Sequence, residues 1–172
     1  MARLRWFDRK FDFSFPVELY PEILERLRGT PGRLDERTAG VAEAVQTRRP
    51  GSGWSIRENV GHIADLDAGV FLSRVHAYRN SEPLLPAADL TNAATNDANH
   101  NARSAQEVLE RARQARGLLV AQLESLDPEV FARTSVHPRL GTPMRLVDMM
   151  FFVAEHDDHH LATITELVRA SR

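Results

Sequence analysis

The sequence predicts an all-α fold, a four-helix bundle with long connecting loops and an extended N-terminal arm. Four stretches carry apolar residues at the 3.6-residue spacing of an amphipathic helix, and two of them begin at a capping-box motif. No segment beyond the aromatic N-terminal one alternates convincingly as a strand does. Amphipathic helices of about 20 residues bury their apolar faces best against one another.

Length and composition set outer limits on the function. The 172 residues fit one domain, 1–172, which is large enough to bury a core. A net charge of −2 argues against a nucleic-acid binder. Without cysteine, any metal site must be built from His, Asp or Glu. We find no signal-peptide pattern and no stretch long enough to span a bilayer, so we expect a cytoplasmic protein without membrane partners.

The N-terminal third contains the arm and two short helical pieces. Residues 1–16 are the arm, in which phenylalanines alternate with polar residues over 11–15. The pattern predicts a helix over 16–29 that stops at its terminal glycine. A second piece with a Thr-Pro start covers 30–47, and one kinked helix or two separate helices fit equally well. Residues 49–53 predict a turn.

The rest of the chain predicts three longer helices. Capping boxes begin the helices over 55–79 and 104–125. The connection 80–103 is rich in asparagine and holds two prolines, which predicts an irregular segment with at most a short helical turn. Residues 132–142 predict another loop, and the Thr-Pro pair that follows caps the last helix over 142–170.

Two histidines one turn apart lie on the apolar face of this last helix. His156 and His160 point the same way and can share one ion. A single core histidine is usually just hydrogen-bonded, but burying two imidazoles without partners costs about 1–3 kcal/mol each. The pair therefore favours a metal site. His159 points about 100° away from His160, so we expect it to flank the site or to lie on the surface.

The same run also reads H-D-x-x-H, close to the H-E-x-x-H motif of zinc proteases. Asp157 stands where the protease needs glutamate as general base, and its side chain is one methylene shorter. No third ligand follows downstream. We therefore do not favour a protease.

A third ligand must come from elsewhere, because zinc-type catalytic sites usually have three protein ligands. His62 is the best candidate, at the rim of the apolar stripe of the first capping-box helix, although a lone histidine there is more often a surface residue. His76, His100 and His137 are weaker candidates. Asp65, one turn after His62, could orient its second ring nitrogen, although a solvated carboxylate is the simpler interpretation.

Two further features have simpler explanations. The asparagines of residues 80–103 could hydrogen-bond a substrate as a lid, but a plain surface loop is an equally good interpretation. Arg111, Arg113 and Arg116 are most simply a solvated helix face.

The run GWSIRENVGHIADLD, followed about ninety residues later by EHDDHHLATI, resembles the DinB/YfiT-like family, whose members are regarded as metal-dependent enzymes. The opening WFDRKFDFSFPVELYPEILERLRGTP resembles one subgroup of it, so the resemblance covers nearly the whole chain. It implies an up-down-down-up bundle, commonly dimeric, with nickel or zinc on three histidines. The family's ligands fall on His62, His156 and His160, which the spacing also favours, and His159 is not a ligand.

The resemblance leaves the reaction open. Better-understood relatives are transferases and isomerases that use low-molecular-weight thiols such as bacillithiol or mycothiol, and a bound metal lowers the pKa of a thiol. We therefore expect a homodimeric, metal-dependent transferase of a thiol to a small electrophile. The alternatives are a metal-dependent hydrolase of a small ester or amide, and a non-catalytic bundle that a metal stabilises.

Overall fold

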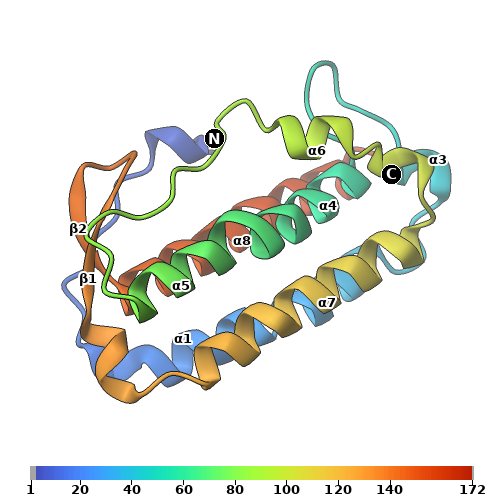
Figure 1. Cartoon of the computed structure of the whole chain (residues 1–172). Helices are drawn as coiled ribbons and strands as arrows, with labels where there is room; N and C mark the ends of the chain where they lie inside the picture. Colours follow the sequence, from blue (N-terminus) through green and yellow to red (C-terminus); the bar gives the residue numbers. More distant parts are fainter. Residues whose placement is uncertain (1–2, 172) are drawn as a thin grey trace.

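The computed structural model describes residues 3–171, and within them four long helical segments form a bundle (Figure 1). The segments are α1 (Tyr20–Arg28) with α2 (Thr30–Thr38); α4 (Ile56–Leu66), a π-helical turn (Asp67–Phe71) and α5 (Leu72–Arg79); α7 (Ala105–Glu124); and α8 (Leu146–Arg169). Shorter helices are α3 (Glu43–Gln46) and α6 (Ala93–Asp97), with 3-10 turns at Trp6–Asp8, Val17–Leu19, His100–Ala102 and Pro128–Ala132. The predicted all-α four-helix bundle is confirmed.

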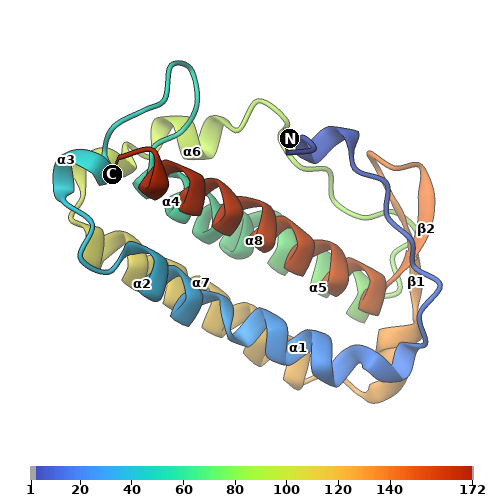
Figure 2. The same cartoon turned by 180° about the vertical axis from the view of Figure 1, so that it is seen from behind.

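The order of the segments is up, down, down, up. The α1–α2 segment and α8 run in one direction, and α4–α5 and α7 run in the other (Figures 1 and 2). The second and third long segments, α4–α5 and α7, run parallel to each other. The connection 80–103 between them must therefore return along the whole bundle, and it passes over α4 and carries α6 there. None of the helices in the described part of the chain is long and apolar enough to cross a membrane.

The N-terminal arm lies along α8. Phe11, Phe13 and Phe15 are half-buried while the residues between them are exposed, as the alternation predicts. The Phe11 ring packs 5.0 Å from that of Phe152, and the Arg145 guanidinium donates to the carbonyls of Phe13 and Phe15. Residues 3–16 form no ladder with another strand, so these contacts hold the described part of the arm in place.

α1 ends at Arg28 with Gly29 as its C-cap, as predicted, but Gly29 keeps a helical conformation. Gly29 has φ −74° and ψ −13°, within the helical region. Its amide donates to Glu25 and its carbonyl accepts from Arg33, so α1 and α2 form an almost continuous helix. A glycine ends a helix when it adopts positive φ, and the glycine that does so here is Gly40, with φ +70°. The second piece therefore ends before α3, well short of residue 47.

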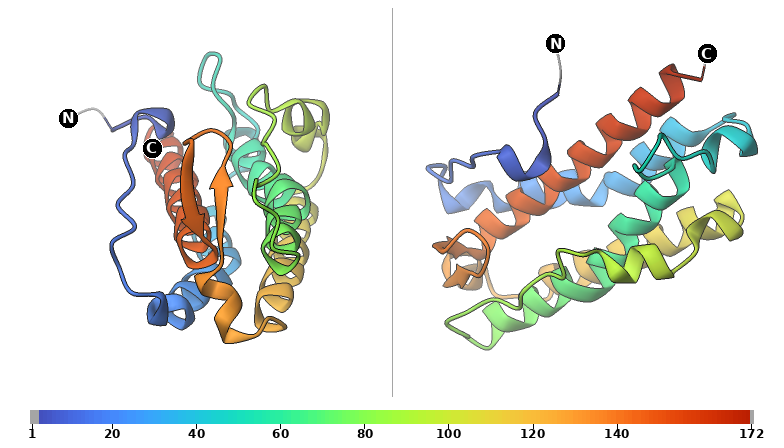
Figure 3. Two further views of the ribbon diagram at one scale, coloured as in Figure 1. Left: turned by 60° about the vertical axis from the view of Figure 1, so that its left-hand side comes forward. Right: turned by 90° about the horizontal axis from the view of Figure 1, so that it is seen from above.

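A β-hairpin replaces the loop predicted over 132–142. β1 (Thr134–His137) pairs antiparallel with β2 (Thr142–Arg145), and Figure 3 shows the hairpin at one end of the bundle. Consequently α8 begins at Leu146, and Asp148 caps it by accepting from the amide of Arg145 at 2.8 Å. Four-residue strands are too short to show a clear alternation, so the sequence prediction missed them.

A buried ionic network joins α2, the π-helical turn, α7 and α8. Arg116 is 1 % exposed and donates to Asp67 at 2.8 Å and to Asp157 at 2.9 Å. Thr30 adds a hydrogen bond to Asp157 at 2.7 Å. Burial raises the pKa of Asp67 to about 6. The predicted solvated position is therefore wrong for Arg116 and confirmed for Arg111 and Arg113, which are exposed.

Candidate metal centre

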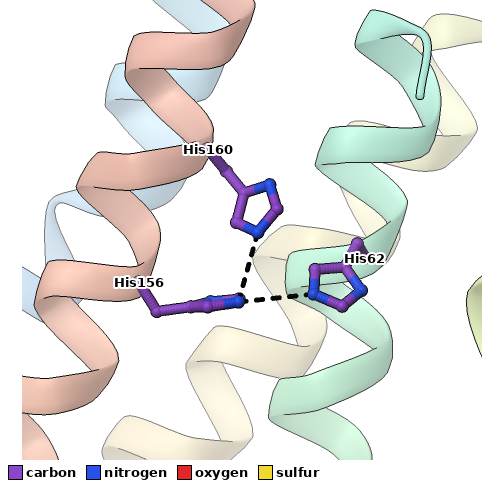
Figure 4. A group of neighbouring side chains, drawn as sticks. All are labelled: His62, His156 and His160. Atoms are coloured by element: carbon purple, nitrogen blue, oxygen red, sulfur yellow. Dashed lines mark hydrogen bonds between the residues drawn. The ribbon is translucent and has the colours of Figure 1, made fainter. Parts of the chain in front are cut away.

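Three histidines converge between α4, which carries His62, and α8, which carries His156 and His160 (Figure 4). Nε2 of His156 lies 3.1 Å from Nε2 of His160 and 3.3 Å from Nε2 of His62. One nitrogen from each ring lies within 4.8 Å of the others, and all three residues are buried. The structure thus brings together the three residues that the sequence predicts as ligands.

Local sequence explains how each helix presents its histidines. On α8, His156 and His160 are one turn apart and therefore share a face. The start of α4 is held by a capping box in which Ser55 accepts from the amide of Glu58 and the Glu58 carboxylate accepts from the amide of Ser55. Two turns further on, His62 faces α8. It is 4 % exposed, which decides between the neighbouring-helix and surface interpretations.

A hydrogen-bond relay determines which nitrogen of His62 carries the proton. The Thr95 hydroxyl donates to the Asp65 carboxylate at 3.0 Å. Having used its proton, this hydroxyl accepts from Nδ1–H of His62, also at 3.0 Å. Nε2 of His62 is therefore unprotonated, and its lone pair points into the cluster.

Hydrogen bonds orient the ring of His160 in a similar way. The Asn59 amide nitrogen donates to the carbonyl of Ser55 at 2.8 Å, which orients the side-chain oxygen of Asn59 toward His160. Nδ1–H of His160 donates to this oxygen at 2.8 Å. Nε2 of His160 consequently also presents a lone pair to the centre of the cluster.

His156 lies between these two lone pairs. A single N–H on its Nε2 can serve only one of them well, and its Nδ1 is buried without a hydrogen-bond partner among the described residues. Burial lowers the pKa of His62 to about 4 and the pKa values of His156 and His160 well below 6.5. All three rings are therefore neutral at neutral pH, which is the form that ligates metals. The donor set fits a divalent transition metal.

Residues 80–103 contain more helix than the sequence predicts, namely α6 and the 3-10 turn at His100–Ala102. Side chains of this connection support the histidine cluster. The His100 ring is fully buried against Gly61, and its Nε2 donates to Asp65 at 2.8 Å. Burial alone would raise the pKa of Asp65, but the hydrogen bonds from His100 and Thr95 hold it below its usual value. Asp65 is therefore not the solvated carboxylate that the sequence favoured: it orients His62 through Thr95, which no sequence signal identified.

A cavity of about 550 Å³ opens over the cluster. Aromatic side chains make up much of its wall: Trp6, Phe7, Trp54, Phe71 and Phe152. The Trp6 ring packs 5.0 Å from His156, and the Trp54 ring packs 4.5 Å from His62. The N-terminal arm, the loop before α4, the connection after α5 and the hairpin turn all contribute to the wall. This volume is typical of sites for small molecules.

The remaining histidines lie outside the three-histidine cluster. His159 is half-buried and lines the cavity beside His160, as the flanking interpretation predicts. Burial, with smaller contributions from Arg3 and Arg9, lowers its pKa to about 4. His76 is exposed, whereas His137 is buried and lines the cavity. Asp157 is bound in the network of Arg116, so it is not free to act as a protease base.

An up-down-down-up helical bundle with a buried three-histidine cluster under an aromatic cavity is therefore the class that fold and site define. The sequence model of the DinB superfamily matches residues 26–164. The chain belongs to the DinB superfamily.

Relatives share this fold over most of their length. A "Putative metal-dependent hydrolase" of Bacillus licheniformis is 27 % identical over 163 residues, covering 88 % of this chain and 89 % of the relative. The "Putative metal-dependent hydrolase YfiT" of Bacillus subtilis is 24 % identical over 163 residues, covering 91 % and 88 %. The solved structure of YfiT superposes with a TM-score of 0.80 at 21 % identity, over 95 % of this chain and 93 % of YfiT.

A second solved structure extends the likeness to an enzyme that uses a thiol. The mycothiol-dependent maleylpyruvate isomerase superposes with a TM-score of 0.66 at 14 % identity. The match covers 86 % of this chain and 60 % of the isomerase. At this identity the comparison demonstrates a shared fold.

Proposed function

We propose that the protein is a metal-dependent enzyme in which His62, His156 and His160 hold one nickel or zinc ion. The observation that carries the proposal is the convergence of three Nε2 atoms, two of which have their lone pairs directed inward by hydrogen bonds at Nδ1. Such outer hydrogen bonds orient metal-binding histidines and raise their basicity. The metal, when bound, would lower the pKa of a thiol or water and make it a nucleophile near neutral pH.

The reaction that we propose is transfer of a low-molecular-weight thiol to a small electrophile. A cavity of about 550 Å³, within the range for ligand sites, lies beside the cluster and would receive the reacting molecules. The names of the two Bacillus relatives favour a second candidate, a metal-dependent hydrolase. The substrate that we propose for it is a small ester or amide.

Metal content tests the first part of the proposal. Wild type purified in the presence of nickel or zinc should carry about one ion per chain, and the triple variant His62→Ala/His156→Ala/His160→Ala should carry none. His76→Ala is the matched control, because His76 is exposed on the same helical segment as His62. Equal metal binding by the wild type and triple variant would refute the site.

Turnover by the metal-loaded protein tests the second part. The assay uses a panel of electrophiles, esters and amides, each with and without a thiol such as cysteine or a bacillithiol-type thiol. Turnover that requires thiol supports the transferase, whereas turnover that ignores it establishes the hydrolase instead. A chelator that lowers the melting temperature, with no turnover on any substrate, would mean that the metal only stabilises the bundle. Light scattering of the same samples tests the homodimer.

A further inference from the structure

One corner of the cavity collects positive charge without a counter-charge. Arg74 is 2 % exposed, and Arg139 lies in the turn between β1 and β2. Both line the cavity, and neither forms an ion pair with any carboxylate in residues 3–171. Burial, with a smaller contribution from the charge of Arg139, lowers the pKa of Arg74 to about 10, so the Arg74 guanidinium is charged at neutral pH. Burying such charges unpaired is costly.

Hydrogen-bond donors at this corner also lack acceptors. Nδ1 of His137 accepts from the amides of Arg139 and Leu140 at 3.2 Å each. Burial lowers the pKa of His137 to about 4, so the ring is neutral and its proton is on Nε2, which is buried without a hydrogen-bond partner among residues 3–171. Nη2 of Arg139 is likewise buried and unpartnered. Arg74 makes one hydrogen bond, from Nε to the carbonyl of Pro86 at 3.0 Å. Three side chains thus offer hydrogen-bond donors at this corner of the cavity.

Asp89 is the carboxylate that lines the same cavity, but it is already engaged. Its two oxygens accept from Thr91 at 2.7 Å and from the amide of Ala93 at 2.9 Å. Asp89 is also exposed and lies in the loop before α6. Its hydrogen bonds therefore stabilise the loop in which it lies, and Asp89 does not neutralise the guanidiniums of Arg74 and Arg139.

The corner lies about one helical turn from the histidine cluster. On α8, Phe152 precedes His156 by one turn, and the His137 ring packs 5.3 Å from Phe152. The Arg139 guanidinium lies 5.7 Å from the same ring. From the other side, Phe71 packs 5.9 Å from His156, and Arg74 follows Phe71 by three residues on the next turn. One small molecule can therefore contact both places.

We infer that Arg74, Arg139 and His137 form an oxyanion subsite that binds the carboxylate group of the substrate. This inference rests on the proposed function, because it names the class of molecule that meets the metal: a small carboxylate, with its reactive atom a few bonds from the carboxyl group. Guanidinium groups match the planar geometry of a carboxylate. The aromatic walls would hold the apolar part of the molecule between the two ends.

Binding of benzoate tests the subsite by calorimetry, first on metal-free protein, so that a metal cannot hold the carboxylate. Wild type should bind benzoate at least tenfold more tightly than benzamide, which has the same shape without the charge. Arg139→Gln and Arg74→Met should each weaken benzoate binding about tenfold or more, since each removes a charge-assisted hydrogen bond. Arg37→Gln removes an exposed charge from α2 and should change nothing. Phenyl phosphate distinguishes a phosphate from a carboxylate as the natural group.

The outcomes separate the two proposals. Benzoate binding that is indifferent to Arg139 in a folded variant, or no tighter than benzamide binding, overturns the subsite even if the protein binds metal. Tighter binding of phenyl phosphate than of benzoate overturns the carboxylate assignment. Arginine-dependent binding of benzoate by a protein that takes up no metal supports the subsite and refutes the proposed function. Circular dichroism verifies that each variant is folded. If the variant of the more deeply buried Arg74 does not fold, Arg139→Gln alone tests the subsite.

Discussion

Replacing Gly61 with alanine should destabilise the protein, although the same change inside a helix normally stabilises it. An alanine Cβ at this position would overlap three carbon atoms of the His100 ring. The ring must leave, which removes its hydrogen bond to the Asp65 carboxylate, worth about 1.5–3 kcal/mol. Lost burial of the ring adds about 1 kcal/mol, and better helix propensity returns about 1 kcal/mol. The expected net loss is roughly 2 kcal/mol.

Urea denaturation measures this loss, and two controls isolate its cause. Gly117→Ala lies in α7 with no atom within 4 Å of the added methyl, so it should gain about 0.5–1 kcal/mol. In a His100→Ala background the overlap is gone, so Gly61→Ala should also stabilise there. A Gly61→Ala variant as stable as wild type, or one whose effect keeps its sign when His100 is absent, would refute this explanation.

Further predictions concern the buried network and the histidine cluster. Arg116→Met leaves the buried carboxylates of Asp67 and Asp157 without their charged partner, so it should lower the free energy of unfolding by about 3–5 kcal/mol. Urea denaturation measures this loss, and the exposed Arg113→Met should cost less than about 1 kcal/mol in the same assay. Thr95→Val breaks the relay to His62 and should weaken zinc binding about 10–100-fold in a competition assay, with Thr91→Val unchanged. The folded-state pKa of His62, about 4, lies below the unfolded value near 6.5. His62 therefore contributes up to about 3 kcal/mol to the free energy of unfolding above pH 6.5, and this contribution is lost as pH falls toward 4. Metal-free His62→Gln should show a smaller loss over that range, and an unchanged pH profile would contradict the assignment.

Features encoded in neighbouring residues were predictable from the sequence. The capping boxes at Ser55 and Ser104 begin α4 and α7 as expected, because such caps act over three residues. His156 and His160 share a face because a helix repeats every 3.6 residues, so their proximity needed no tertiary information. His62 followed from the need for a third ligand, and the family resemblance led to the same residue.

Only the tertiary structure decided the partners that lie far apart in the chain. Thr95 comes from a polar loop with no distinguishing pattern, and it reaches His62 because the connection returns over α4. In the sequence Arg116 looks like one more charge on a helix surface, but in the folded protein it reaches Asp157 of α8 through the bundle interior. His137 and Arg139 meet the cavity because a short hairpin folds over the end of the bundle. Periodicity along a helix specifies which face is buried, whereas the choice of polar partner depends on how the helices and their connections pack together.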